Sequence, residues 1–310
     1  MKNSLFKDKK MNKLKGFLGP MRLPFLVLTP ACIFLALACS VYVKGFESIQ
    51  LSHVLLLLLG AICAHISVNA LNEYFDFKSG LDFNTQATAF SGGSGTLPEF
   101  PNLAGYTLSI GIMCATICAV IGVYFLMVIG VGLLPIGVIG MILVLAYTPI
   151  ITRSAVFSLI APGLGFGPLM IMGSYYVLTG EYSWVIFLVS LIPFFLVNDL
   201  LLLNQFPDIN ADKGVGRKNL AILLGTKKSA KVYCLFLALA FLVLILSVGL
   251  KQVPNMALVG LLIIPVAIWT GKGVIKHHDN INKLLPFMAL NVTMNILTPV
   301  LVGIGLMITS

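Results

Sequence analysis

Two short segments that combine Asn with carboxylate residues stand out in a chain that has few charges. Together they hold five of the eleven acidic residues, and each repeats polar side chains at intervals of four. Residues four apart lie on one face of a helix, so each segment would present a row of oxygen atoms. Mg²⁺ binds a few carboxylates and completes its shell with water and phosphate oxygens. The two segments therefore predict a magnesium site that also takes a phosphate-bearing ligand.

The first motif begins at Asn72 and ends at Asp82. Asn72 and Asp76 are four apart and share a helix face. Gly80 permits a turn that would bring Asp82 back toward that row. Glu73 adds a carboxylate that we assign to orienting the metal or the diphosphate. This motif alone is also compatible with an ordinary solvated helix end.

The second motif begins at Asn204 and continues through Asp208 to Asp212, again at intervals of four. Pro207 lies inside it and is expected to distort the start of the row. Two carboxylate rows facing each other would repel strongly unless cations lay between them. The expected metal ligands are Asn72, Asp76, Asp82, Asn204, Asp208 and Asp212.

The elements that position these motifs are expected to be membrane-spanning helices. The 310 residues are 58% hydrophobic and 10% charged, with a mean hydropathy of +1.01, far more apolar than a soluble domain of this length. Runs of about 20 apolar residues recur throughout. They predict an all-α bundle of nine transmembrane helices, at residues 23–43, 49–71, two within 100–152 separated by a turn at 130–135, and then 154–178, 182–204, 232–250, 252–271 and 284–308.

The basic residues predict how this bundle is oriented. Lys and Arg near span ends favour the cytoplasmic side. With the N-terminus inside, eighteen of the twenty basic residues lie on that side, and only Lys44 and Lys251 lie outside. Both motifs then fall at cytoplasmic helix ends, after the second and sixth spans. We divide the chain into a basic cytoplasmic segment, residues 1–22, and a nine-helix domain, residues 23–310.

The net charge of +9 is explained by this topology and does not indicate nucleic-acid binding. An integral, multi-pass protein of a prokaryotic plasma membrane is the expected setting, with membrane lipid as a partner.

With two such motifs after helices two and six of nine, the chain resembles the UbiA superfamily of intramembrane prenyltransferases. The second motif is followed by Gly216-Arg217-Lys218-Asn219-Leu220, as in that family. Within the superfamily it most resembles the dihydroxynaphthoate branch of menaquinone synthesis, through residues 72–76, 91–95 and 173–180. The resemblance implies a central cavity with a cytoplasmic cap, Mg²⁺ as cofactor, an isoprenyl diphosphate as donor, and an aromatic acceptor such as 1,4-dihydroxy-2-naphthoate.

The resemblance also suggests roles in catalysis. Asp76 and Asp208 would hold the metal that draws charge onto the departing diphosphate. The basic residues best placed to contact the diphosphate are Lys78, Arg153, Arg217 and Lys218. For Lys78, a role in topology alone is an equal alternative. Tyr147 is expected to orient a substrate or stabilise a carbocation through its ring, or else to anchor the helix at the interface.

Several other polar positions invite interpretation. Residues 91–95, Ser-Gly-Gly-Ser-Gly, are expected to cap the cavity. Asp199 lies inside the sixth span, which makes it a functional candidate without an assigned role. Asn291 and Asn295 are expected to pack between helices.

Two other functions compete with prenyl transfer. An ion-coupled transporter would use the same acids as ion ligands, but such sites usually lie near the membrane midplane. A UbiA-type terpene cyclase would keep the metal site and cyclise the prenyl chain. Formation of product with or without an acceptor distinguishes the transferase from the cyclase.

Overall fold

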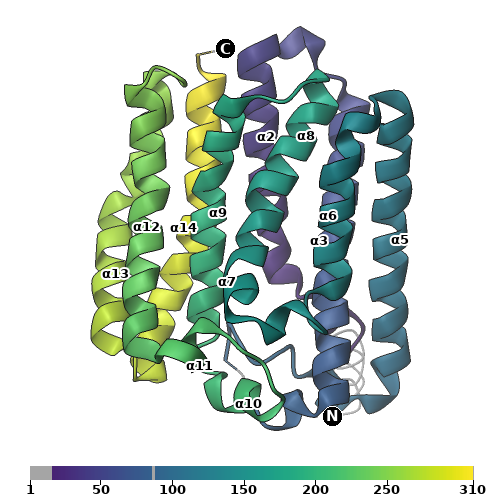
Figure 1. The fold of residues 1–310 in the computed structure, drawn as a ribbon, viewed down its shortest axis with the longest axis vertical. Coiled ribbons are helices and arrows are strands. Elements are labelled where there is room, and N and C mark those ends of the chain that lie inside the picture. The colour runs from purple at the N-terminus through teal and green to yellow at the C-terminus, as the bar shows by residue number, and fades with distance from the viewer. Residues whose placement is uncertain (1–15, 86–87, 310) are drawn as a thin grey trace, which may run out of the picture.

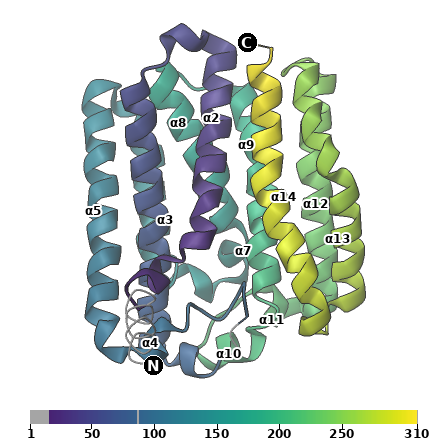
Figure 2. The same ribbon diagram turned by 180° about the vertical axis from the view of Figure 1, so that it is seen from behind.

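The computed structural model describes residues 16–85 and 88–309. Regular structure in these residues is helical, and the long helices run side by side as a bundle (Figure 1). The same bundle seen from behind in Figure 2 has α2 and α14 on the near side. Most of the expected basic segment 1–22 lies outside the described residues, including all of its lysines.

The expected spans correspond to helices, several of which are longer or more segmented than anticipated. The main elements in chain order are α2 (Leu28–Lys44), α3 (Leu51–Ser79), α5 (Ala104–Val128), α6 (Leu134–Ala146), α7 (Ala155–Leu164), a π-helical segment (Gly165–Leu169), α8 (Met170–Thr179), α9 (Trp184–Asn204), α12 (Thr226–Gly249), a 3₁₀ segment (Asn255–Ile263), α13 (Ile264–His277) and α14 (Ile281–Met307). Three short helices, α4 (Thr96–Glu99), α10 (Ile209–Gly214) and α11 (Leu220–Leu224), lie in the connections.

The prediction of nine spanning helices is wrong by one. In the described part of the chain, eight helices are long and apolar enough to cross a membrane. The missing span is the apolar helix Val131–Ala146, whose sixteen residues would rise only about 24 Å against a hydrocarbon core of about 30 Å. It begins after a turn at Gly130, where φ is +130°, inside the range in which a turn was expected. The chain is an integral, multi-pass membrane protein.

One cluster of buried apolar side chains includes residues of α9 and of the two helices packed against it, α12 and α14. Its fully buried side chains include Leu196, Leu203, Tyr233, Leu244 and Val302. In a bilayer, such interfaces are stabilised by close packing, because lipid tails are as apolar as the side chains. This packing fixes the position of the end of α9, from which the second motif emerges.

Two glycines, one in α7 and one in the π-helical segment that follows it, allow a close approach to α9. A Cβ atom on Gly163 would lie 2.1 Å from the Phe194 carbonyl oxygen, and one on Gly167 would lie 2.6 Å from that of Ser190. Any side chain at either position would push the two segments apart. Close backbone packing therefore fixes α7 and the π-helical segment against α9, the helix that carries the second motif.

Helices α3 and α9 both end at one end of the bundle, the lower end in Figure 1, which we call the site end. Helix α3 continues through the first motif to Ser79 and is terminated by Gly80 in the left-handed conformation, with φ +79°. Both motifs are thus brought to the same end of the protein.

Candidate active site

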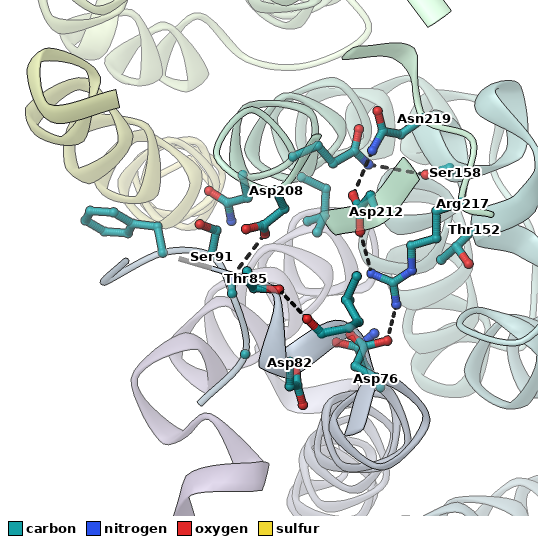
Figure 3. A pocket seen from close by; sticks show the side chains of 18 of the residues that line it. Asp76, Asp82, Thr85, Ser91, Thr152, Ser158, Asp208, Asp212, Arg217 and Asn219 are labelled. Carbon is teal, nitrogen blue, oxygen red and sulfur yellow. Dashed lines mark hydrogen bonds and ion pairs between the residues drawn. The ribbon is translucent and has the colours of Figure 1, made fainter. Parts of the chain in front are cut away.

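A cavity of about 110 Å³ lies at the site end and is lined by both motifs (Figure 3). All six residues expected to bind metal contribute to its wall, together with Tyr147 and Arg217. The sequence suggested no role for several other lining residues, which are Thr85, Thr152, Ser158, Gln205 and Asn219. Two of these had a signal, since Gln205 lies within the second motif and Asn219 belongs to the stretch that follows it.

Arg217 joins the two motifs. Its guanidinium donates one hydrogen bond to Asp76 and another, of 3.0 Å, to Asp212 (Figure 3). Asp212 is held on its other oxygen by the Asn219 amide at 2.8 Å. Burial lowers the pKa of Arg217, but the two carboxylates more than offset that effect and raise it. Arg217 therefore remains charged and neutralises part of the acidic wall.

The second motif is interrupted where Pro207 was expected to distort it. Helix α9 ends at Asn204, and α10 begins only at Ile209, so that Asp208 has non-helical dihedral angles. Pro207 explains the break, because it lacks the N–H that would continue the helical hydrogen bonds. The three polar side chains still reach one cavity, since the turn redirects the chain beneath the end of α9.

The first motif adopts the expected arrangement. Asp76 is in the last turns of α3, and the left-handed Gly80 turns the chain into a 3₁₀ segment (Leu81–Phe83) that carries Asp82. Both carboxylates line the cavity. Asn72 donates to the Thr148 hydroxyl at 3.1 Å and accepts from Arg22 at 3.2 Å, so its amide is oriented by two neighbours.

The loop of residues 91–95 covers the cavity. Gly92 donates its N–H to Asp208 at 3.1 Å, and Gly92 and Gly93 both have positive φ. A Cβ atom on Gly93 would lie 3.1 Å from an Asp82 oxygen. The paired glycines therefore allow backbone to pass directly over carboxylates of both motifs.

Glu73 holds this loop and lies outside the cavity wall. It is fully buried, accepts the backbone N–H of Ser94 at 3.0 Å and its hydroxyl, and forms an ion pair with Arg22 at 3.4 Å. The structure thus gives Glu73 a positioning role for the cap.

Glu73→Gln is expected to loosen the cap. Hydrogen bonds to a charged acceptor contribute about 1.5–3 kcal/mol each, and the amide keeps the shape but loses the charge. Amide hydrogen exchange in residues 91–96 should accelerate severalfold, and Mg²⁺-dependent turnover should fall moderately. Glu99, exposed at the end of the short helix α4 that follows the loop, provides a control, and Glu99→Gln should change neither. Equal exchange in wild type and Glu73→Gln would contradict the assignment.

The donor set fits a divalent cation. Within residues 16–85 and 88–309, the buried oxygens Asp82 Oδ2, Asn204 Oδ1, Gln205 Oε1 and Asp208 Oδ1 have no hydrogen-bond partner, and all four residues line the cavity. No three His, Cys, Asp or Glu side chains of the described chain converge closely enough to enclose a metal alone. Mg²⁺ suits such a set, because it uses few protein ligands and completes its shell with water and phosphate.

The carboxylates resist ionisation without a cation. Burial, and then the charges of Glu73 and Asp76, raise the pKa of Asp82 to about 8. Burial raises the pKa of Asp208 to about 7, and the negative charge of Asp212 is the second cause of this shift. These shifts indicate a site whose negative charge is only partly neutralised by its arginines.

This electrostatic arrangement predicts opposite effects of pH and Mg²⁺. A carboxyl group with a raised pKa in the folded state contributes stability below its ordinary pKa, and that contribution is lost as pH rises through the folded-state value. With a chelator present, the thermal unfolding midpoint should therefore decrease as the pH is raised from about 5 to about 8. Mg²⁺ should stabilise the protein more at pH 8 than at pH 6. A pH-independent response to Mg²⁺ in thermal unfolding would contradict this.

The structure separates the basic candidates. Of the four basic candidates, Arg217 lines the cavity, whereas Lys78, Arg153 and Lys218 are exposed, and Lys78 lies over the Tyr74 ring at 5.8 Å. Arg22, just before the first expected span, also lines the cavity. Lys218 instead uses its backbone N–H to bind the Thr152 carbonyl at 2.9 Å. Among the described residues, the basic side chains that line the cavity are thus both arginines.

Comparison with known proteins agrees with this architecture. Residues 27–293 match the model of the UbiA prenyltransferase family. The chain is 28% identical over 273 residues to a 1,4-dihydroxy-2-naphthoate octaprenyltransferase of Bacillus subtilis, covering 87% of this chain and 86% of that protein. It is 30% identical over 247 residues to UbiA prenyltransferase domain-containing protein 1 of Danio rerio, covering 77% and 69% of the two chains.

A solved structure shares the fold. The UbiA homologue of Archaeoglobus fulgidus bound to DMAPP and Mg²⁺ has a TM-score of 0.65 at 16% identity, over 95% of this chain and 99% of that one. The family match extends over most of the chain and includes both motifs. This chain is therefore an enzyme of the UbiA prenyltransferase family.

Proposed function

We propose that the protein transfers a prenyl group from an isoprenyl diphosphate to an aromatic acceptor in a Mg²⁺-dependent reaction. One observation carries the proposal: a single cavity collects unpartnered oxygens from both motifs beside two arginines. Such a cavity suits a phosphate group held by cations on one side and by metal-bridged carboxylates on the other. The related structure with DMAPP and Mg²⁺ supports the same pairing of donor and metal.

The metal would be held by Asp76, Asp82, Asp208 and Asp212, with Asn72 and Asn204 as neutral ligands or orienting groups. When bound, Mg²⁺ supplies electrostatic stabilisation of the leaving diphosphate. Negative charge grows on the diphosphate as the bond to the allylic carbon C1 breaks. Arg22 and Arg217 lie where they would stabilise that charge.

Other residues of the chain would act around this step. Tyr147 lines the cavity and would present its ring to the cationic carbon. An electron-rich carbon of the acceptor would then attack the allylic carbon, and the ring would regain aromaticity by losing a proton, or the carboxylate as CO₂, from the carbon that formed the new bond. The exposed Arg153, Lys218 and Lys78 are assigned to attracting the anionic donor to the cavity mouth.

For the acceptor, we infer a quinone precursor, 1,4-dihydroxy-2-naphthoate, on the basis of the Bacillus subtilis relative. Purified protein should be incubated with Mg²⁺ and geranylgeranyl diphosphate, with and without this acceptor, and the products identified by mass spectrometry. A prenylated product that forms only in the presence of the acceptor is expected. A hydrocarbon formed equally well without acceptor would identify a cyclase and contradict the transfer reaction.

We further propose that the site end faces the cytoplasm. In a cysteine-free background, Lys227→Cys at the site end and Glu47→Cys in the opposite connection provide a matched pair. A membrane-impermeant thiol reagent should label residue 47 in right-side-out vesicles and residue 227 in inside-out vesicles. The reverse labelling pattern would show that the site end faces away from the cytoplasm and would contradict the proposed orientation.

A further inference from the structure

Six exposed lysines gather at the site end of α12, α13 and α14. They are Lys227, Lys228 and Lys231 on α12, Lys272 and Lys276 on α13, and Lys283 on α14. None of them lines the active-site cavity. Both ribbon views place the three helices together at one side of the bundle (Figure 1 and Figure 2). We call these six residues the lysine cluster.

Little negative charge lies near the lysine cluster. Asp279 is the only acidic residue of the chain after Asp212. In the described residues, the ion pairs of basic side chains involve Arg22, Lys44 and Arg217, and none involves a lysine of the cluster. The cluster is therefore a strongly positive surface that is open to anions from outside the chain.

Two contacts show how α12 and α13 lie against each other. The Thr226 hydroxyl and His278 Nδ1 are 3.0 Å apart at the site end, and a Cβ atom on Gly271 would lie 3.4 Å from the Cys234 sulfur farther along. Residue numbers rise along α12 where they fall along α13, so the two helices are antiparallel. Cys234 and Gly271 mark the seam at which the helices face each other.

Helical geometry turns lysines of both helices to one side of this seam. Lys231 lies about 60° around α12 from Cys234, and Lys272 lies about 100° around α13 from Gly271. Each angle is taken in the direction in which its own helix winds. Because the helices are antiparallel, both angles lead to the same side of the seam. Lys276 is one turn beyond Lys272 and shares its face.

Exposed apolar side chains continue these faces away from the site end. Leu235 is one turn from Lys231 on α12 and is 55% exposed, and Trp269 is one turn from Lys272 on α13 and is 62% exposed. Each face thus carries lysine at the site end and an apolar side chain next to it. A phospholipid has the same order, because its charged headgroup lies at the surface and its acyl chains extend into the bilayer.

We propose that the lysine cluster binds the headgroups of anionic phospholipids in the leaflet at the site end. Each basic residue near an anionic membrane surface strengthens the attraction about fivefold. An acidic protein would contact the lysines but not Leu235 and Trp269, which belong to helices long and apolar enough to span the membrane. The inference concerns the lipid around the protein and does not rest on the proposed prenyl transfer.

The two tryptophans of the chain provide a reporter and a matched control. Trp269 adjoins the lysine cluster, whereas Trp184 begins α9 at the opposite end of the bundle and is 69% exposed. Trp184→Phe and Trp269→Phe each leave a single tryptophan in the full-length protein. Both variants are reconstituted in bilayers with equal amounts of phosphatidylglycerol and phosphatidylcholine, in which the acyl chains of one lipid or the other carry bromine.

Bromine quenches tryptophan fluorescence only at close range, so the two labelled bilayers report which lipid lies beside each tryptophan. Phosphatidylglycerol should be enriched over phosphatidylcholine about fivefold or more around Trp269. It should show no enrichment around Trp184. Equal quenching of Trp269 by the two lipids would overturn the proposal and leave the lysines as an orientation signal.

A triple substitution locates the effect. Lys231→Gln, Lys272→Gln and Lys276→Gln, combined in the protein that keeps only Trp269, should lower the enrichment of phosphatidylglycerol severalfold. All three lysines are exposed, so the variant should fold. An enrichment that is unchanged in this variant would overturn the proposal.

A second triple variant removes the same charge from exposed positions elsewhere at the site end. It combines Lys78→Gln, Arg153→Gln and Lys213→Gln. This variant should keep the enrichment of phosphatidylglycerol around Trp269. An equal loss in both triple variants would show that net charge alone attracts the lipid, and the proposed binding surface would be wrong.

Salt tests the lysine cluster without any substitution in it. Raising NaCl from about 0.01 M to about 1 M shortens the screening length from about 30 Å to about 3 Å. The enrichment of phosphatidylglycerol around Trp269 should then fall toward the value at Trp184. An enrichment that persists at high salt would contradict binding through exposed charges. Because no measurement involves turnover, these results do not depend on the proposed prenyl transfer.

Discussion

Asp76→Asn or Asp208→Asn should each lower prenyl transfer by about two to three orders of magnitude, the loss typical of removing one preorganised electrostatic group. Asp76 lies in α3 and Asp208 in the turn between α9 and α10, so each variant removes one carboxylate from one motif. Asn keeps the size of the side chain, which separates the loss of charge from a change in packing. Turnover of geranylgeranyl diphosphate, measured across a Mg²⁺ titration, is the appropriate assay.

The control for these variants is Glu181→Gln. Glu181 forms an ion pair with Lys44 at 3.0 Å, between the α8–α9 connection and the end of α2, far from the site end. Both side chains are substantially exposed, so this pair contributes little to stability. Glu181→Gln should keep wild-type turnover. If Asp76→Asn and Asp208→Asn also kept it while remaining folded, the assignment of the motifs to the metal would fail.

Arg217→Gln should combine a loss of activity of about a hundredfold or more with a loss of stability. The guanidinium bonds to one carboxylate of each motif, and removing one partner of a well-buried pair costs about 3 kcal/mol or more. The Arg217 side chain is 16% exposed and that of Asp76 is 7% exposed, so this ion pair is well buried. Arg217→Lys should recover little, since an ammonium group cannot reproduce the planar fork.

The two effects of Arg217→Gln can be separated with Mg²⁺. The unfolding midpoint should fall most in chelator and recover when Mg²⁺ neutralises the carboxylates, whereas turnover should stay low. The adjacent Lys218 provides the matched comparison, because its side chain is exposed and does not line the cavity. Lys218→Gln should mainly raise KM at low ionic strength. Equal losses of kcat in both variants would show that Arg217 has no special position.

Sequence patterns predicted the location of the site because scarce charge is conspicuous in an apolar chain. The prediction that Asn72 and Asp76 share a face required only that the helix continue through the first motif, and α3 continues through Ser79. The arrangement of the second motif was harder to predict, because local backbone geometry decides how Pro207 interrupts the helix. The return of Asp82 was predictable from Gly80, since glycine readily adopts the left-handed conformation found there.

Contacts between distant segments were not predictable. The Arg22 side chain reaches Asn72 because its backbone adopts a left-handed conformation, with φ +51°, which is uncommon for arginine. Glu73 looked like a site carboxylate by its place in the motif, but it turns toward Ser94 and the cap. The length of the fourth apolar helix was also hidden, because a charge-free stretch carries no marker of where a helix leaves the membrane.

The bond from Arg217 to Asp76 joins residues 141 positions apart. Such a separation has a consequence for biosynthesis, since domains inserted in order from the N-terminus meet their later partners only after synthesis has advanced. Asp76 is synthesised long before this partner, because Arg217 is added only when 217 of the 310 residues have been made. The contact that joins the two motifs can therefore form only late in the synthesis of the chain.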